Sequence, residues 1–527
     1  MYESSSIAKN SPRSIKISYR TFSLVCLLYL LLPIVVFISF FTKLHVAVLA
    51  NSLLLITFCF LTKEIYSSSK GKQTISIFLG RLLVFIVIAF LWAFISGIGE
   101  FADSTWDHAV RYATLHDLVY YKWPVFFDLS KQSLGEVRGI LGGDTVAFAY
   151  YFTFYLIPAL VGKVFGLFAA RVALLIWSTF GLLAVMIAIS FFIGKAKLII
   201  PVMCLLFAGF DIIPFTIISK IDNSIGYEGW NQAFNIVGTF CQTMNVYHQC
   251  IPGWLIILLL LNTHSNKYVG TISSLIFCYS PWATFGIIPF AAYELFRKDF
   301  RNHSKRIYLK SIFHFGNILV PLTLFICFSG FFSSNSNALS TNGFSWQYTS
   351  SFFMFLLKYI MCIVFEFGIW VVFLFRHNKS NPLLWIAAAE LFVFPLYQIS
   401  INNDLLMRGS MAPMLVLMIL VISQMSNDSK SPINDSNSKK IRKGYADALA
   451  IVACSFTPIL LILMTIVGTV KLYNHQLPKE DTYYLQIISF GDIRDPNYAQ
   501  LVDQQFFVHN YSDTFYYKYI GKSDDSQ

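Results

Sequence analysis

The chain has 527 residues, of which 56% are hydrophobic and only 13% are charged, and its mean hydropathy is +0.61. Soluble domains carry about twice that charged fraction, so the composition excludes a soluble globular enzyme, a disordered chain and a fibre. The formal net charge of +11 comes from 39 basic and 28 acidic residues. In so apolar a chain, basic residues mark one side of a membrane, and no nucleic-acid partner is expected.

Apolar stretches that can cross a lipid bilayer as helices recur along most of the chain. We therefore predict an all-α polytopic membrane protein with about 13 transmembrane helices. The predicted spans are 21–41, 44–62, 75–98, 170–193, 198–218, 251–263, 268–281, 283–296, 309–332, 352–375, 382–400, 410–425 and 446–471. Three of them, 251–263, 268–281 and 283–296, are short, which indicates thin, broken or partly re-entrant helices.

The distribution of charge predicts the orientation. With the N-terminus placed inside, the inner segments hold 23 of the 39 basic residues and only five of the 28 acids. This is the bias that cytoplasmic loops show. We expect a multi-pass protein of the plasma membrane with a cytoplasmic N-terminus and an extracytoplasmic C-terminus.

The span pattern divides the chain into four parts. Residues 1–74 form the N-terminal tail with two spans, 75–425 the membrane core with an acidic outer loop at 99–169, 426–445 a polar inner linker, and 446–527 the last span with an outer tail. The apolar segment 146–166 would invert every later loop if it crossed the membrane. We predict that it lies on the outer face as a helix; the alternative is a true span.

The outer loop carries the first candidate chemistry. If residues 103–121 are helical, Asp103 and Asp107 fall near one face, and His116 lies further along the same segment. Two carboxylates four residues apart suit base catalysis or the binding of a divalent metal ion. The alternative is an acidic helix that simply faces solvent.

The remaining candidates lie at the outer ends of later spans. Asp211 ends an apolar run, where a carboxylate is costly unless it is paired, and Glu228 follows it. His248 precedes Pro252 at the start of a span, which suits an anion site or an interfacial hydrogen bond. Asp404 and Arg408 have the spacing of a local ion pair, and the same arginine suits phosphate binding.

These polar groups share one predicted side of the membrane. A transporter would concentrate its polar groups near the midplane and open to both sides. The one-sided distribution favours an enzyme that acts on a lipid headgroup.

Several sequence strings resemble a group of bacterial polytopic proteins that is itself similar to the type C (GT-C) glycosyltransferase superfamily. They are KVFG (163–166) before AARVALLIW (169–177), TWDHAVRYATLHDLVYYKWPV (105–125), FAGFDIIP (207–214), VYHQCIPGW (246–254), SPWATFGIIPF (280–290) and NDLLMRGSMAP (403–413). The resemblance covers about residues 75–425. It implies a GT-C-like helical bundle with helices lying on the outer membrane face.

The resemblance also implies a chemistry. Proteins of this superfamily use a polyprenyl-phosphate-linked sugar as donor, and an acidic residue of the first outer loop acts as base for the acceptor. That residue corresponds to Asp107 here, with Asp103 second, although two spans precede the loop where typical members have one. The implied acceptor is a cell-envelope glycan, lipid or protein, and the basic partners are Arg408 and His248.

Two other functions stay open. A polymerase or ligase of lipid-linked polysaccharide would share the one-sided layout, but acids outnumber bases in this outer loop. A transporter or flippase of envelope precursors would use intramembrane acids, for which Glu366 and Glu390 are the candidates.

Overall fold

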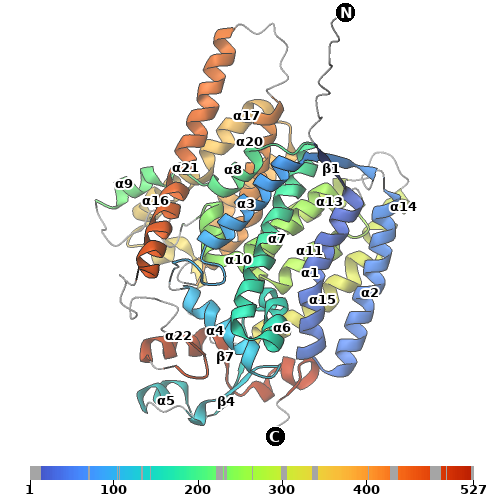
Figure 1. Ribbon diagram of the computed structural model, residues 1–527, viewed down its shortest axis with the longest axis vertical. Helices are drawn as coiled ribbons and strands as arrows, with labels where there is room; N and C mark the ends of the chain where they lie inside the picture. The colour runs from blue at the N-terminus through green and yellow to red at the C-terminus, as the bar shows by residue number, and fades with distance from the viewer. Residues whose placement is uncertain are drawn as a thin grey trace, which may run out of the picture.

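The structure, a computed structural model, is mostly helical (Figure 1). It describes residues 13–523 apart from several short segments. Those segments are 69–71, 104, 106, 132–134, 143, 221–229, 231–233, 235, 264, 298–304, 335–341, 401–402, 428–436, 475–487 and 494. The candidate Glu228 therefore lies outside the described residues.

Within the described residues, eight helical stretches are long and apolar enough to cross a membrane. They are Tyr19–Phe41 (α1), Leu44–Ser67 (α2), Leu167–Ile193 (α7), Thr239–Asn262 (α10), Tyr308–Ser333, Phe352–Asn378, Asp404–Ser426 and Cys454–Tyr473. The stretch Tyr308–Ser333 joins the end of α14 (Lys305–Ile312) to α15 (Phe315–Ser333), and Phe352–Asn378 runs from α16 (Phe352–Met361) to α17 (Ile369–Asn378). The stretch Asp404–Ser426 combines α19 (Asp404–Gly409) with α20 (Met411–Asn427), and Cys454–Tyr473 is the end of α21 (Asn437–Tyr473). The chain is thus an all-α protein of multi-pass membrane type.

Other predicted spans contain helices that are shorter or interrupted. They are α3 (Leu79–Ile95), α8 (Ile199–Leu206), α9 (Ile212–Ile218), α11 (Val269–Ser274), α12 (Pro281–Phe285), α13 (Ile288–Arg297) and α18 (Pro382–Val393). The span predicted at 251–263 is longer than expected, because α10 starts at Thr239. Its first half is rich in polar residues that lower the local hydropathy, and the fold buries them inside the bundle.

Residues 268–297 form a helical hairpin that enters the bundle and turns back. At its entrance Lys267 pairs with Glu64 at the end of α2, and at its depth the Tyr279 hydroxyl donates to the carbonyl of Leu30 midway along α1. The turn is local in origin, because the Ser280 side chain accepts from the Ala283 amide and Pro281 occupies the first helical turn. The sequence predicted two short or re-entrant segments here.

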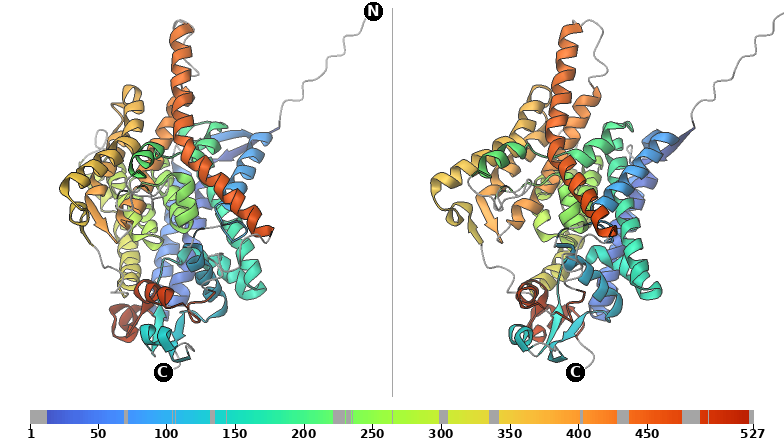
Figure 2. Two further views of the ribbon diagram at one scale, coloured as in Figure 1. Left: turned by 90° about the vertical axis from the view of Figure 1, so that its left-hand side faces the viewer. Right: turned by 60° about the vertical axis from the view of Figure 1, so that its left-hand side comes forward.

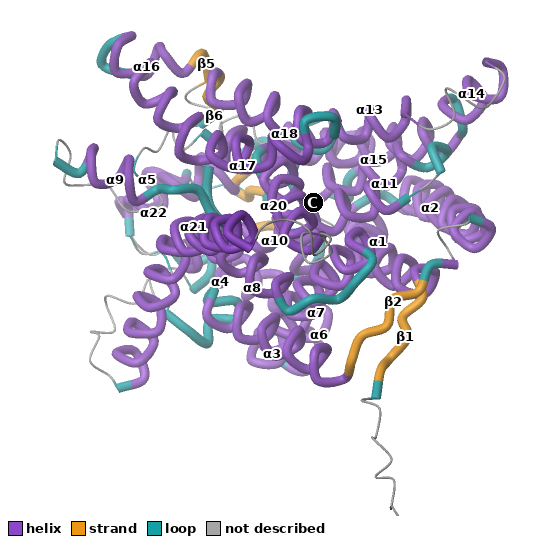
Figure 3. The backbone as a smooth tube through the Cα atoms, turned by 90° about the horizontal axis from the view of Figure 1, so that it is seen from above, coloured by secondary structure: helices purple, strands orange, loops and turns teal. Residues whose placement is uncertain are grey.

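One end of the bundle carries the N-terminal ribbon. Strands β1 (Ser14–Ser18) and β2 (Thr74–Phe78) pair antiparallel with Ser14 opposite Phe78, beside the first turn of α1. Seen from above, the ribbon lies at the edge of the helix cluster (Figure 3). The first part of α21 (Asn437–Tyr473) projects beyond the other helices at this end (Figure 2).

The opposite end carries a cap built from segments far apart in sequence (Figure 1). Its elements are α4 (Asp107–Tyr120), β3 (Phe126–Asp128), α5 (Gly135–Leu141), β4 (Thr145–Phe148), α22 (Pro496–Phe506) and β7 (Phe507–Val508). The strands form one sheet in the order β3–β4–β7. A separate two-stranded sheet joins β5 (Asn342–Phe344) to β6 (Tyr397–Ile399).

The segment 146–166 is only partly the helix that was predicted. It begins inside β4, makes the short 3-10 turn Thr153–Tyr155, and becomes the helix α6 (Leu156–Phe165). Gly166 has φ of 87°, which ends α6 and lets the chain turn directly into α7. Paired with β3 and β7, the first residues satisfy their backbone groups as a strand, so no helix forms there.

The long helix α10 lies at the centre of the bundle. Within its most apolar stretch 94% of the residues are buried, against 22% for the last span, Cys454–Tyr473. Four tryptophans of the core are fully buried, and Trp92 donates from its indole N–H to Thr243 of α10 at 2.7 Å. Functional groups on α10 are therefore held by neighbours on every side.

Candidate functional site

The site is organised around an irregularity in α10. Val246 has φ of −143° and ψ of 39°, so the helix is kinked there. Pro252 has no amide hydrogen and cannot donate to the carbonyl of His248, one turn earlier. Backbone carbonyls between Met244 and Pro252 are therefore available to accept from side chains, where a regular helix would bond them internally.

A first Asp–Arg pair reaches this kink from the cap. Asp107, the first residue of α4, pairs with Arg111 one turn later, with 3.1 Å between Oδ2 and Nη2. Arg111 donates from Nη1 to the carbonyl of Met244 at 2.9 Å, and the His108 ring nitrogen Nε2 contacts the same carbonyl at 2.8 Å. The arginine side chain is 4% exposed and the aspartate 36%, so the carboxylate is the accessible member.

The ionic state of the cap residues follows from burial. Burial, with Arg111 next in importance, lowers the pKa of His108 to about 3, so this imidazole is neutral at physiological pH. Arg111 also stacks its guanidinium over the ring of Tyr247 at 5.6 Å. The charged groups that meet at this point are thus Arg111 and Asp107.

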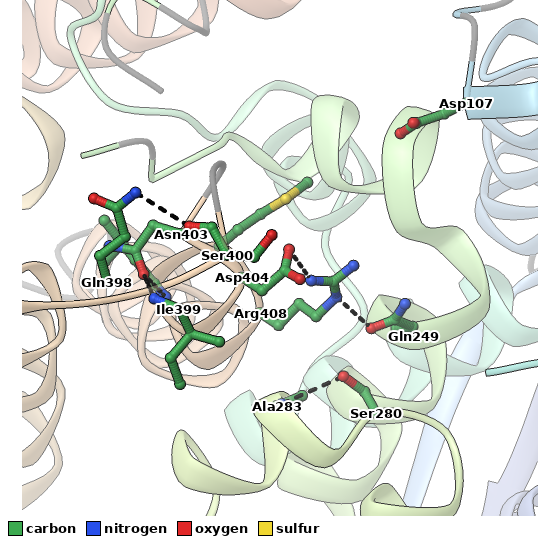
Figure 4. A network of polar contacts seen from close by, with 12 residues as sticks. Asp107, Gln249, Ser280, Ala283, Gln398, Ile399, Ser400, Asn403, Asp404 and Arg408 are labelled. Carbon is green, nitrogen blue, oxygen red and sulfur yellow. Dashed lines mark hydrogen bonds and ion pairs between the residues drawn. The ribbon is translucent and has the colours of Figure 1, made fainter. Parts of the chain in front are cut away.

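A second Asp–Arg pair reaches the kink from the other side. Asp404 and Arg408 form an ion pair within the short helix α19 (Asp404–Gly409). The side-chain oxygen of Asn403 caps this helix by accepting from the backbone amide of Leu406. Arg408 donates from Nε to Oε1 of Gln249 at 2.8 Å. Figure 4 shows Arg408 between Asp404 and Gln249, with Ser280 beside them and Asp107 standing apart.

The helical hairpin 268–297 packs against α19. Gly286 lies against the carbonyl of Gly409 so closely that a Cβ atom at position 286 would collide with it. Only glycine allows two backbones to approach to this extent. Ser280, the N-cap of α12, is drawn next to Gln249 in Figure 4, so the hairpin borders the site.

Tyrosines surround the histidine between the two pairs. The ring of His248 lies 6.0 Å from Tyr150, 5.4 Å from Tyr155 and 5.6 Å from Tyr247, measured between centroids. Burial raises the pKa of Tyr150, and the nearby guanidiniums of Arg111 and Arg408 oppose that rise. Tyr150 therefore lies within electrostatic reach of both Asp–Arg pairs.

The C-terminal segment positions Tyr150. The amide of Ala149 donates to the carbonyl of Phe506 at 3.0 Å, and the Phe506 ring packs against Tyr150 with 4.6 Å between centroids. The C-terminal tail therefore packs on the outer loop and contacts Tyr150 through Phe506.

Three of the predicted site residues, His248, Asp404 and Arg408, are joined through Gln249. Asp107 stands apart from them and reaches the same kink through Arg111 (Figure 4). The other three described candidates lie elsewhere. Asp103 precedes α4 and has its carboxylate against Gly468 of α21, and His116 pairs with the buried Asp117 at 2.8 Å. The carboxyl of Asp117 also accepts from the amide of Phe490, so this pair ties α4 to the C-terminal segment.

Asp211 belongs to a second buried polar cluster. Its carboxyl faces Glu366 and Thr457, and the indole of Trp230 donates to Glu366 at 2.6 Å. Glu366 sits in a π-helical turn, Cys362–Gly368, between α16 and α17. The described contacts of Asp211 therefore separate it from the α10 kink.

Four residues of the site were missed by the sequence analysis: Arg111, Gln249, Tyr150 and Tyr155. Arg111 had a signal, because the spacing Asp-x-x-x-Arg occurs at both 107–111 and 404–408. Gln249 had one as the neighbour of His248. The tyrosines lie in an aromatic-rich apolar run that gives no sign of which rings face the site.

Metal binding has no further support from the described residues, where no group of three or more His, Cys, Asp or Glu side chains gathers. No family model, curated protein or solved structure matches the chain. The GT-C resemblance and the divalent metal ion stay predictions, and function has to be inferred from the geometry of the site.

Proposed function

We propose that the protein is a membrane-embedded glycosyltransferase that moves a sugar from a polyprenyl-phosphate donor to a cell-envelope glycan, lipid or protein acceptor on the outer membrane face. The observation that carries the proposal is the partly exposed carboxylate of Asp107, held by the buried guanidinium of Arg111 at the cap end of an apolar helix bundle. A second guanidinium, that of Arg408, approaches the same α10 kink, and both guanidiniums lie within electrostatic reach of Tyr150. Arg111 fixes this carboxylate without burying it.

The proposed reaction uses each group according to its charge. Asp107 takes the proton of the acceptor hydroxyl as the acceptor oxygen bonds to the anomeric carbon of the sugar. The bond from that carbon to the phosphate oxygen breaks, and the phosphate leaves with the electron pair. Arg408 stabilises the added negative charge, with Asp404 holding the guanidinium in place.

The architecture supports a lipid-linked donor. A prenyl chain needs an apolar path, and the exposed side chains of the bundle are largely apolar along its length. A GT-C-like arrangement, with the cap outside and the N-terminal ribbon inside, agrees with the excess of basic residues in the segments predicted to be cytoplasmic.

The test is sugar transfer by the purified protein in vesicles that contain a labelled polyprenyl-phosphate sugar and envelope acceptor material. Replacement Asp107→Asn keeps the shape and the hydrogen bond to Arg111 but removes the base, so transfer should fall about 100-fold or more. The matched control is Asp513→Asn, because Asp513 is 80% exposed and belongs to the C-terminal segment. Full activity of the Asp107→Asn protein would refute the proposal.

One observation favours a second candidate function, the transport or flipping of an envelope precursor. The buried acids Asp211 and Glu366 face each other within the bundle, and Glu366 lies in a π-helical turn, a feature common at functional sites. Movement of a labelled lipid across sealed vesicles, lost in Glu366→Gln and retained in Asp107→Asn, would favour transport over glycosyl transfer.

A further inference from the structure

Three side chains at the α10 kink form a chain of hydrogen bonds in which each donor and acceptor can be assigned. Arg408 Nε lies 2.8 Å from Gln249 Oε1, and Gln249 Nε2 lies 3.0 Å from His248 Nε2. The chain of hydrogen bonds thus runs from an ion-paired guanidinium through an amide to an imidazole. All three members are buried or nearly so.

The hydrogen-bonding chemistry of these groups fixes the tautomer of His248. A guanidinium can only donate, so Arg408 requires the oxygen of Gln249 to face it. The amide nitrogen of Gln249 then faces His248, and it too can only donate, so Nε2 of His248 has to be the acceptor. A neutral imidazole carries one hydrogen, which is therefore on Nδ1.

The resulting N–H has no partner in the described part of the chain. His248 is fully buried, and its Nδ1 atom makes no hydrogen bond to any described residue. An unsatisfied buried donor costs about 1–3 kcal/mol. Such a cost is retained most readily where a ligand supplies the acceptor.

The surroundings of Nδ1 select the charge of that acceptor. The guanidiniums of Arg111 and Arg408 both lie within electrostatic reach of the His248 ring. Their two aspartate partners are the more exposed members of each pair. A buried donor between two cations favours an anionic oxygen over a neutral hydroxyl.

We propose that the Nδ1–H of His248 donates to a phosphate oxygen of the bound lipid, and that Gln249 is the positioning residue that keeps the hydrogen on Nδ1. The proposal rests on the proposed function, which supplies a lipid phosphate at this site. His248 acts as a neutral donor of one tautomer, so its role does not require protonation of the ring. Arg408 has a second task here, because it sets the orientation of the Gln249 amide.

The first experiment measures binding of polyprenyl phosphate to the purified protein in nanodiscs. Replacement His248→Asn keeps an N–H near the position of Nδ1, whereas His248→Leu fills the space without a donor. We expect the leucine variant to bind at least 10-fold more weakly and the asparagine variant to stay within about 3-fold of the wild type. Equal loss in both variants, or full affinity in the leucine variant, overturns the proposal.

Inorganic phosphate distinguishes two sources of the ligand. If inorganic phosphate displaces polyprenyl phosphate from the wild type but not from His248→Leu, His248 belongs to a phosphate site that does not need the lipid chain. Binding of the lipid without such competition assigns the site to a membrane-bound headgroup. Binding of neither probe overturns the proposal.

The second experiment reads the tautomer directly by nitrogen-15 NMR of histidine-labelled protein in lipid. The signal that disappears in His248→Asn should have the shift pattern of an Nδ1-protonated ring. Replacement Gln249→Glu offers Arg408 and His248 only acceptor oxygens, so the hydrogen should move to Nε2 and phosphate binding should fall. An Nε2-protonated ring in the wild type overturns the proposal.

The two proposals fail in distinguishable ways. Loss of phosphate binding in His248→Leu together with an absence of sugar transfer would remove the proposed glycosyltransferase activity and keep the role of His248. Sugar transfer that stays at the wild-type rate in both His248→Asn and His248→Leu would keep the glycosyltransferase activity and remove the role of His248.

Discussion

The two Asp–Arg pairs at the α10 kink have the same spacing and opposite uses. Arg111 donates to a backbone carbonyl, that of Met244, and is almost completely buried. Arg408 donates to a side-chain amide, that of Gln249, and is 12% exposed. A bond to a backbone carbonyl holds α4 against α10 but orients no further side chain. A bond to the Gln249 amide oxygen also orients the amide nitrogen, which then donates to His248. The difference shows that the acceptor of a buried arginine determines its role.

The largest expected effect tests the structural side of this comparison. Replacement Arg111→Met removes the hydrogen bond to the Met244 carbonyl, the ion pair with Asp107 and the stacking on Tyr247. We expect a loss of about 2–4 kcal/mol in stability, measured by thermal unfolding in detergent. Arg408→Met should cost less stability and lose phosphate binding. The opposite order of stabilities would reverse the assignment of the two roles.

The next effect concerns the pH dependence of a third acid–arginine contact, between Glu100 and Arg171, with 3.7 Å between Oε2 and Nε. Burial raises the pKa of Glu100 from 4.5 to about 8, and Arg171 only partly opposes this. The folded state therefore binds a proton that the unfolded state releases, so stability should fall as the pH rises from about 4.5 to about 8. The loss amounts to at most about 5 kcal/mol, at about 1.4 kcal/mol for each pKa unit.

Thermal unfolding across this pH range checks the Glu100 prediction against the Glu100→Gln variant. The variant should lose most of the slope, because its side chain is neutral at every pH. A wild-type stability that increases with pH through this window would mean that the ion pair with Arg171 outweighs burial.

A smaller effect separates the pairs by their neighbours. Replacement Gly286→Ala places a methyl group against the carbonyl of Gly409 and forces α12 and α19 apart, which moves Arg408 but not Arg111. We expect about a 10-fold loss of phosphate binding with a loss of about 1–3 kcal/mol in stability. The control is Gly80→Ala, because nothing lies within 4 Å of a Cβ atom built there. Unchanged phosphate binding in Gly286→Ala would mean that the position of the hairpin does not affect the site.

The smallest effect comes from an exposed ion pair in the C-terminal segment. Lys518 and Asp513 approach to 3.7 Å, but their side chains are 48% and 80% exposed. Solvent screening limits such a pair, so Asp513→Asn should change stability by less than about 0.5 kcal/mol. A larger change in the melting temperature would mean that exposure is a poor guide to the importance of charged pairs in this protein.

Much of the architecture could be predicted from the sequence, because hydrophobic stretches report burial in lipid directly. Every predicted span contains helix, and the prolines of 280–290 marked the helix break at Ser280. The ion pair of Asp404 and Arg408 follows from helical spacing alone. The start of α4 was placed too early, so Asp103 does not share a helix face with Asp107.

The remaining parts of the site depend on contacts between distant segments. Helical periodicity gives the face of a residue and not the rotation of its helix against a neighbour. The bond from Arg111 to Met244 spans 133 positions, and its acceptor is a backbone atom that any residue would supply. Tyr150 depends on Phe506, and Asp211 meets Glu366 across the bundle. None of these pairings has a local signature.

The route of the C-terminal segment has a consequence for biogenesis. After β7 the chain returns to the turn between α1 and α2, where the Tyr516 hydroxyl donates to the carbonyl of Phe41 and the amide of Lys43 donates to that of Ile520. A nascent chain released before residue 506 would insert all its spans yet leave Tyr150 without its support. Ribosomes stalled at successive positions should therefore yield protein that is membrane-integrated early and competent to bind ligand only late.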